Sequence, residues 1–365
     1  MNDITRKIYA GLLSAIHDRS IGPGSPLPPE TRLAEQFGTN RMNAHHAVKR
    51  LEDHGLVVRK KRVGTEVRQN IDYELVSRLL KEINRIVYVL YSSTPHWIHW
   101  NENSFTALEK EIAPAGYNII YGMIPVDGTR ADHHRILHEI SAAGASALVI
   151  FPDAEDTAFL RHNNDLLLDF QMPVYMLNRS GETMAMDMVS FVSGDPFGDA
   201  AAVGTLLQRQ GCRQVGMLNE ASGTLFWGVK RYEGLALGLE RGGNPTPPNF
   251  LGTKDGFAAA AQAIRQAQGD FVLVAVNNQY AAQFIDFAAQ QGLRVPADYR
   301  LVSFDDNPLY RSYNLTSMAA PMERIGRLFG KLICDQSWLK EYRGKVSIKV
   351  NSELVFRETF SLKKS

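Results

Sequence analysis

The sequence predicts an α/β protein, in which a small helical head ending in a β-hairpin precedes two tandem lobes built on doubly wound parallel sheets. Three observations lead to this prediction. The 365 residues exceed the size of one ordinary domain. Residues 1–70 are basic, with 12 Lys or Arg against seven Asp or Glu, whereas the other 28 basic and 32 acidic residues give the rest a net charge of −4. From residue 85 onward, strand-like and helix-like segments alternate.

Composition and cysteine content narrow the class of protein. The apolar fraction of 44% is typical of globular proteins. The two cysteines, Cys212 and Cys334, lie far apart and form no CxxC pair, so we expect neither a disulfide framework nor a zinc site. No apolar stretch resembles a signal peptide or reaches the ~18 residues of a membrane span. We therefore expect a cytoplasmic protein with no membrane partner.

Residues 1–70 contain three helical segments and a hairpin in a fixed order. Apolar residues at helical spacing predict a helix over 4–16, a short capped helix follows Leu27, and Asn40 can cap a third helix that ends at Gly55. Two short β runs, 56–59 and 65–67, flank a basic loop over 60–64. A helix, a helix-turn-helix and a basic β-wing form an arrangement that places the last helix in the major groove of DNA.

The residue types on the last helix and the hairpin suit this role. Arginine and asparagine side chains read base edges, and hairpin cations contact phosphates or the minor groove. Any small helical domain can carry solvated charges, but here the helix pair, the cap and the basic hairpin coincide in the expected order, which favours DNA binding. The candidate DNA-binding residues are Arg32, Asn40, Arg41, Asn43, His45, His46, Lys60, Lys61, Arg62, Gly64 and Thr65.

The stretch from Leu27 to Val67 resembles the DNA-binding domain of the GntR family of bacterial regulators. The family patterns "LP-S-E-x-x-LA", "[ST]R-x-T-[VI]-R-x-A-[LI]", "L-x-x-x-G-[LI]" and "GxGT-[FY]-V" correspond to LPPETRLAEQF, NRMNAHHAVKRL, LEDHGLV and RVGTEV. The resemblance implies that Arg41 stands at the head of the recognition helix and that Gly64 and Thr65 form the wing tip. The sequence departs from the family pattern at His45, Arg62 and Glu66.

The rest of the chain alternates strands and helices, and the alternation restarts once near residue 189. The predicted strands cover 86–91, 117–123, 147–151, 174–177, 189–192, 214–218, a short run near 250, 271–275 and 301–304. The predicted helices cover 104–113, 133–143, 156–170, a segment ending near 210, 230–241, 257–268 and 280–292. Two such lobes enclose a cleft at the carboxyl ends of their strands. Residues 71–84 show no obvious core stripe, so the predicted parts are a head (1–70), a linker (71–84) and a two-lobed body (85–365).

Polar side chains suited to a polyol recur at the ends of the predicted strands. Carboxylates, amides and arginine bind hydroxyl groups, and aromatic faces cover the C–H patches of sugar rings. Because Asp and Asn after a strand are more often turn formers or helix caps, only their recurrence at several strands supports a sugar site. The candidate ligand-binding residues are Trp97, Trp100, Asp195, Phe226, Trp227, Arg231, Asn277, Asn278 and Asp305.

From about residue 85 the sequence resembles the LacI/GalR effector domain, which is itself similar to periplasmic sugar-binding proteins. The segments VSGDPFGDAAAVG, KRYEGLALGLERGG, VAVNNQYAAQF and LVSFDDNP follow the family patterns "D-N-x-x-G-[AG]", "R-x-x-G-[FL]", "A-x-N-D-x-x-A" and "[VI]-[GS]-[FY]-D-[DN]". The resemblance implies ligand contacts at Asp195, Arg231, Asn277 and Asp305. Departures from the pattern occur at Pro196 and Asn278. A GntR head on a LacI-type, periplasmic-binding-protein-like body is similar to the AraR-type arrangement of sugar-catabolism regulators.

We expect an effector-responsive transcription regulator and not an enzyme. The sequence contains no GxSxG, P-loop, HExxH or GxGxxG motif in a strand-to-helix turn. His134 and His138 could suggest a metal, but a solvated helix face is the favoured interpretation, so no metal or cofactor is expected. The regulator should be a homodimeric repressor that binds an inverted-repeat operator in double-stranded DNA, and a sugar or related small polar effector should change its operator affinity. The alternative is a sugar-binding receptor with no DNA role.

Overall fold

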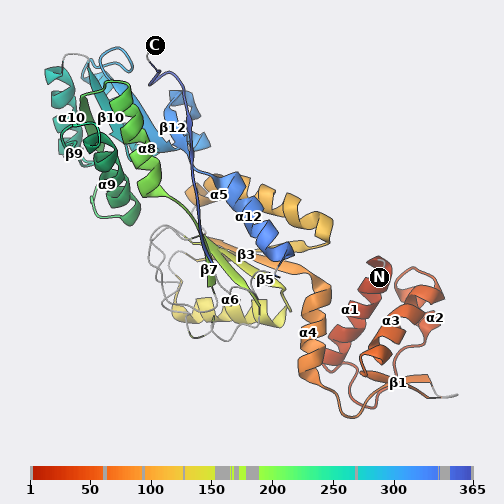
Figure 1. Ribbon diagram of the computed structural model, residues 1–365. Coiled ribbons are helices and arrows are strands. Elements are labelled where there is room, and N and C mark those ends of the chain that lie inside the picture. Colours follow the sequence, from red (N-terminus) through yellow and green to blue (C-terminus); the bar gives the residue numbers. More distant parts are fainter. Residues whose placement is uncertain are drawn as a thin grey trace. The chain divides into compact units, whose positions relative to one another are not determined.

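The computed structural model describes residues 3–60, 64–92, 95–125, 128–152, 165, 167, 172–177, 189–267, 270–335, 337 and 346–362 (Figure 1). It contains a small helical head with a two-stranded hairpin and two six-stranded sheets. The predicted α/β fold class is confirmed. No helix in these residues is both long and apolar enough to cross a membrane.

The head packs three helices against a hairpin. The helices are α1 (Asp3–His17), α2 (Glu30–Gln36) and α3 (Arg41–Asp53), and the hairpin pairs β1 (Val57–Lys60) with β2 (Gly64–Val67) in antiparallel register. The apolar stripe of α1 faces Ala44, Ala47, Val48 and Leu51 of α3 in one core. Because the backbone around Pro26 also pairs with β2, the segment before α2 is fixed to the hairpin.

The segment expected to be a linker is a helix of the head core. Helix α4 (Tyr73–Asn84) is capped by Asp72, whose carboxylate accepts from the Leu75 amide at 3.0 Å. Val76, Leu79 and Leu80 are buried in the same cluster as α1, so the expectation that this segment lacks a core stripe is wrong. The charged residues between these positions obscure the stripe in the sequence. Only Arg85, in the left-handed region at φ 46°, separates α4 from the first strand of the body.

The first sheet of the body has the strand order β13-β7-β6-β5-β3-β4. Helices α5 and α12 pack side by side (Figure 1), and Gly326 of α12 permits the close approach, because a Cβ there would lie 2.1 Å from the Ser104 carbonyl oxygen of α5. The elements are β3 (Ile86–Ser92), α5 (Pro95–Ile112), a 3-10 turn (Ala113–Ala115), β4 (Asn118–Ile124), α6 (Arg130–Ala142), β5 (Ala147–Phe151), β6 (Val174–Leu177), β7 (Val189–Gly194), α12 (Met322–Cys334) and β13 (Ser347–Val350).

The second sheet has the order β14-β12-β11-β10-β8-β9 and is parallel except at β14. Helices α8 and α9 share one hydrophobic cluster with its strands, and α10 and α11 share another. The elements are α8 (Pro196–Arg209), β8 (Gln214–Leu218), α9 (Phe226–Glu240), β9 (Asn249–Phe250), α10 (Lys254–Gln266), β10 (Phe271–Ala275), α11 (Asn278–Gln290), β11 (Arg300–Asp305), a 3-10 turn (Pro308–Tyr313), β12 (Thr316–Ala319) and β14 (Glu353–Val355).

Most predicted strands of the body match the structure within two residues. The helix expected over 156–170 lies outside the described residues apart from isolated positions. Four elements near the C-terminal end, β12, α12, β13 and β14, were not predicted. Two of them are important for the site, because β13 adds a strand to the first sheet beside β7 and α12 covers the same region.

Candidate functional site

The outward face of α3 is defined by the residues that it buries. Ala44, Ala47, Val48 and Leu51 point into the head core. Successive residues of a helix are rotated by about 100°, so a residue two positions away from a buried one lies on roughly the opposite face. The exposed side chains there are Met42, His46, Lys49 and Asp53, of which the last two lie 3.6 Å apart as an ion pair. Arg41 at the helix start is also highly exposed.

Two asparagines predicted to contact DNA are used in capping. The Asn40 side chain accepts from the Asn43 amide at 3.0 Å and so caps α3. The Asn43 side chain donates to Thr39 Oγ1 at 2.7 Å and accepts from Thr5 Oγ1 of α1 at 3.3 Å. Asn43 is therefore turned toward α1 and the turn before α3, away from the outward face.

The carboxylate of Glu30, at the start of α2, contacts the side chains of Arg41, His45 and Arg59. Its oxygens accept from Arg41 Nε at 3.3 Å and contact His45 Nδ1 at 3.0 Å, and Arg59 of β1 lies 3.4 Å away. Glu30 is 15% exposed, whereas Arg41 is 73% exposed. The bond to Arg41 uses Nε, and within the described residues the two terminal amino groups of the guanidinium have no hydrogen-bond partner. This cluster was not predicted from the sequence.

The wing supplies further polar groups beside α3. Lys60 pairs with Glu66 across the hairpin, and Gly64 has a φ of 120°, which a residue with a side chain rarely adopts. A groove of about 580 Å³ lies between the segment 26–31, α3 and the wing, and Thr65 lines it together with Arg41, His45 and Arg59. Of the other predicted residues, Arg32 is exposed on α2, and Lys61 and Arg62 lie outside the described residues.

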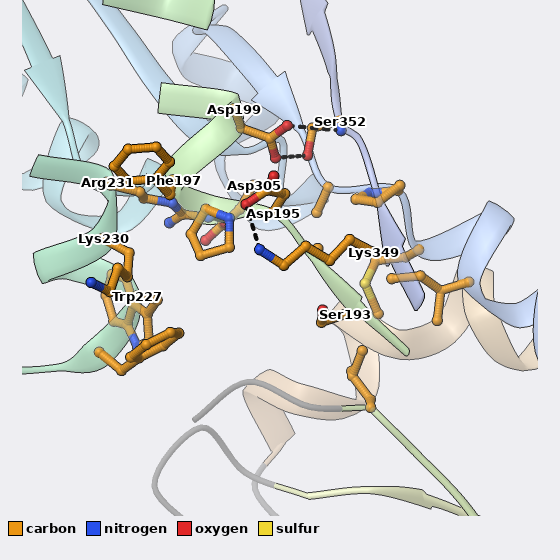
Figure 2. Close-up of a pocket in the computed structure, with 18 of the residues that line it drawn as sticks. Ser193, Asp195, Phe197, Asp199, Trp227, Lys230, Arg231, Asp305, Lys349 and Ser352 are labelled. Carbon is orange, nitrogen blue, oxygen red and sulfur yellow. Dashed lines mark hydrogen bonds and ion pairs between the residues drawn. The ribbon is translucent and has the colours of Figure 1, made fainter. Parts of the chain in front are cut away.

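The body contains a cavity of about 500 Å³ (Figure 2). Its wall combines aromatic and apolar side chains with four carboxylates and three cations. The chemically distinctive lining residues are Asp195, Phe197, Asp199, Phe226, Trp227, Lys230, Arg231, Glu233, Asp305, Lys349 and Ser352. They come from the end of β7, from α8 and α9, from the end of β11 and from the segment around β13, as expected for a site at the carboxyl ends of parallel strands.

Arg231 and Asp305 form the most buried ion pair of the cavity wall. The Arg231 NH2 group donates to Asp305 Oδ1 at 2.7 Å, NH1 donates to the Val276 carbonyl at 2.6 Å, and both side chains are about one-seventh exposed. The guanidinium carbon lies 4.6 Å from the centre of the Phe304 ring. Arg231 Nε and Trp227 Nε1 are buried, and neither has a hydrogen-bond partner among the described residues. Two N–H donors of residues in this wall are therefore left without an acceptor in the described part of the chain.

A second set of contacts joins β13 to the start of α8. Lys349 Nζ lies 3.4 Å from Asp195 Oδ1, and Ser352 donates its hydroxyl and its amide to Asp199 (Figure 2). Burial raises the pKa of Asp199, although the Ser352 hydrogen bonds and Arg231 oppose the shift. Lys349 and Ser352 were missed because the β13 segment was not recognised as part of the fold. Asp199 lies in the predicted helix α8 and was missed because its partner Ser352 belongs to that unrecognised segment.

The structure separates the predicted ligand-binding residues into groups. Asp195, Phe226, Trp227, Arg231 and Asp305 line the cavity. The two asparagines of α11 do not. Asn277 caps the helix by accepting from the Tyr280 amide, and Asn278 is 2% exposed and donates to the hydroxyls of Ser303 and Ser317. Trp97 and Trp100 belong to α5, and their side chains lie outside the described residues.

Two family models match separate parts of the chain. Residues 4–67 match the family model "Bacterial regulatory proteins, gntR family", and residues 205–360 match "Periplasmic binding protein-like domain". The head is thus similar to gntR-family DNA-binding domains, and much of the body is similar to periplasmic-binding-protein-like domains. The gntR match spans the helices and wing that carry the Glu30 cluster, and the body match includes Arg231, Asp305 and Lys349.

Solved structures of transcription regulators share the fold. The LacI-family regulator CCPA from Weissella paramesenteroides, solved with bound sucrose, is 15% identical over 75% of this chain and 98% of its own, with a TM-score of 0.59. A LacI-family regulator from Enterococcus faecium with bound ribose is 15% identical over 76% and 100%, with a TM-score of 0.58. The regulator CelR in complex with cellobiose is 17% identical over 92% and 100%, with a TM-score of 0.58.

Proposed function

We propose that this gntR-family chain is an effector-responsive transcription regulator, whose head binds double-stranded DNA and whose body binds a sugar or a related polyol in the cavity around Arg231. The observation that supports it most strongly is the presence, in one chain, of a gntR-family head with an exposed recognition helix and a body cavity with two partnerless donors. A receptor with no DNA role would leave the head without a function. Contact with chromosomal DNA would place the protein in the cytoplasm.

The cavity chemistry favours a neutral, hydroxyl-rich effector. Its cations are already paired, Lys230 with Glu233, Arg231 with Asp305 and Lys349 with Asp195. An anionic ligand would have to displace these carboxylates. A hydroxyl or ring oxygen can instead accept from Trp227 Nε1 and Arg231 Nε while hydroxyl hydrogens donate to the carboxylates. The sugars in the titles of the similar structures support this choice of class.

The head chemistry favours recognition of base edges by the start of α3. The exposed Arg41 keeps its terminal amino groups free, and this fork is suited to the O6 and N7 atoms of guanine. The net charge of +5 over residues 1–70 follows from their 12 basic and seven acidic residues, and it attracts the phosphate backbone. We propose that two heads of a homodimer read an inverted repeat, because one recognition helix covers only a short half-site.

The connection between the head and the body is short. Helix α4 is part of the head core, and only Arg85 lies between it and β3. Along the chain, the connection from β3 to the head core therefore consists of helix α4 and one residue. The effector acts only through its different affinities for the two states, and we propose repression relieved by the effector as the direction.

Two experiments test the proposal. Duplexes are first selected from a random-sequence pool by the immobilised full-length protein, and the selected sequence is then titrated with wild type, with Arg41→Ala and with Arg294→Ala, an exposed arginine of the body that serves as the matched control. Only Arg41→Ala should lose specific binding. Thermal unfolding against pentoses, hexoses and disaccharides should reveal an effector, since a ligand at 100 times its Kd stabilises the native state by about 2.7 kcal/mol. Failure to enrich any duplex would refute the DNA role, and a flat panel would refute the sugar class.

A further inference from the structure

The recognition helix exposes one large apolar side chain. Met42 is the second residue of α3 and is 59% exposed. It is absent from the core cluster of the head and from the partly buried side chains that pack on it. Its neighbours on the outward face are the polar side chains of His46 and Lys49. Met42 is therefore not part of the hydrophobic core that the described residues of the head form.

The position of Met42 connects it to base recognition. The N-terminal residues of a recognition helix are the ones that contact base edges in the major groove. Arg41, the preceding residue, donates through Nε to Glu30, and both Arg41 and Met42 are exposed in the first turn of α3. A side chain beside Arg41 on the outward face would enter the groove with it.

The chemistry of a thioether limits what Met42 can bind there. Methionine has no hydrogen-bond donor and only a weak acceptor, so it gains little from the amino groups, ring nitrogens or carbonyls of the base edges. The C5-methyl group of thymine is the apolar group that a base pair presents in the major groove. A flexible, polarisable side chain adapts well to such a contact. Single exposed apolar residues are common on protein surfaces, but this one stands at the turn that reads bases.

We infer that Met42 is a specificity-determining residue that recognises the C5-methyl group of a thymine next to the base pair contacted by Arg41. The inference rests on the proposed DNA-binding function. Replacing thymine by deoxyuridine removes this methyl group and leaves the hydrogen-bonding pattern of the base pair unchanged, so the contact can be tested atom by atom.

The test uses the full-length protein and the duplex selected by wild type from a random-sequence pool. Each thymine is replaced in turn by deoxyuridine, and affinities are measured by fluorescence anisotropy for wild type, Met42→Gln and Met42→Leu. For wild type, affinity should fall about four-fold at one thymine of each half-site, the amount expected for one lost methyl contact. Met42→Gln should bind both duplexes with the same affinity, and Met42→Leu should keep the preference for thymine.

The outcomes distinguish failure of the proposed DNA binding from failure of the Met42 assignment alone. If wild type enriches no duplex at all, DNA recognition itself fails and the inference falls with it. If a duplex is enriched but wild type binds every deoxyuridine duplex as tightly as the thymine duplex, only the assignment of Met42 is overturned. Retention of the thymine preference by Met42→Gln would also overturn it. Since Met42 lies on the surface, circular dichroism should show the same fold for all three proteins.

Discussion

Replacement of Arg231 by alanine should destabilise the body by about 3 kcal/mol, in addition to abolishing the response to the effector. The substitution removes a 2.7 Å charge-assisted hydrogen bond to Asp305 and a 2.6 Å bond to the Val276 carbonyl. It leaves the Asp305 carboxylate, which is only 15% exposed, without its cation. Breaking a buried pair by removal of one partner costs ~3–5 kcal/mol, and the partial exposure here favours the lower end of that range.

The backbone at the end of β11 adds to this effect. Asp305 and Asp306 have φ values of 87° and 52°, which place two consecutive non-glycine residues outside the regions they prefer. Two arginines hold this turn. Arg357 contacts both carboxylate oxygens of Asp306 at 2.6 and 2.9 Å, and Arg231 holds Asp305. Without Arg231 one of the two restraints on a strained turn is lost.

Urea unfolding of a double-mutant cycle measures the coupling. Wild type, Arg231→Ala, Asp305→Asn and the double variant are compared, with Arg327→Ala as the control because its i,i+4 pair with Glu323 is exposed. The control should change the free energy of unfolding by less than about 0.5 kcal/mol. The decrease in the free energy of unfolding of the double variant should be smaller, by at least about 1 kcal/mol, than the sum of the decreases in the two single variants. Additive single effects, or a loss in Arg231→Ala no larger than that of the control, would refute the reasoning.

Three further predictions concern the head, the α8–α9 packing and the cavity carboxylate. Glu30→Ala should weaken binding of the selected duplex about five-fold, because it releases Arg41 and Arg59. The same variant should bind a scrambled duplex more tightly at low salt, because the net charge of the head rises by one. Fluorescence anisotropy at two salt concentrations measures both affinities. Gly234→Ala should cost about 1–3 kcal/mol in urea unfolding, because its Cβ would lie 2.2 Å from a backbone oxygen of α8. The raised pKa of Asp199 gives a stabilising contribution that is lost as pH rises through that pKa. The stability of Asp199→Asn relative to wild type should therefore increase as pH rises from the ordinary aspartate pKa through the raised one.

Each of these predictions has an outcome that contradicts it. Parallel changes in the affinities for the selected and scrambled duplexes would show that Glu30 does not position the arginines. An unchanged urea midpoint in Gly234→Ala would mean that the two helices can separate without cost. A stability difference between wild type and Asp199→Asn that is constant with pH would show that Asp199 titrates in the folded protein as it does in the unfolded chain.

The strands and helices that could be predicted from the sequence are those with an uninterrupted hydrophobic pattern. The fully buried strands β5 and β10 were located at their observed bounds. Of the elements that were missed or misread, several are short or only partly buried, whereas α12 is a helix of 13 residues with a buried stripe. In β13 half-buried and exposed residues alternate over only four positions, and in α4 the buried Val76, Leu79 and Leu80 are separated by polar and charged side chains. Such segments are fixed by contacts with distant parts of the chain, which a local pattern does not contain.

The candidate sites show the same limit at the level of single residues. Asp195, Arg231 and Asp305 were predicted because each follows a strand or begins a helix, and they do line one cavity. Asn277 and Asn278 satisfy the same rule, but their side chains cap α11 and bridge two buried hydroxyls. A polar residue after a strand can face the cavity or close the turn, and the choice depends on which neighbour has an unsatisfied hydrogen bond. Lys349 reaches the cavity from a strand adjacent to β7, a pairing that no local pattern predicts.

His45 stands where the gntR pattern has an arginine, so the proposed DNA recognition by α3 should depend more on its other side chains. An imidazole is shorter than a guanidinium, and in His45 one ring nitrogen already contacts Glu30 at 3.0 Å, so only Nε2 remains for a DNA group. The most exposed side chains of the first turn are Arg41 and Met42. The same carboxylate that occupies His45 also fixes Arg41 through Nε. Because His45 replaces the arginine of the pattern and contacts Glu30, the sequence selectivity for DNA should depend mainly on the adjacent residues Arg41 and Met42.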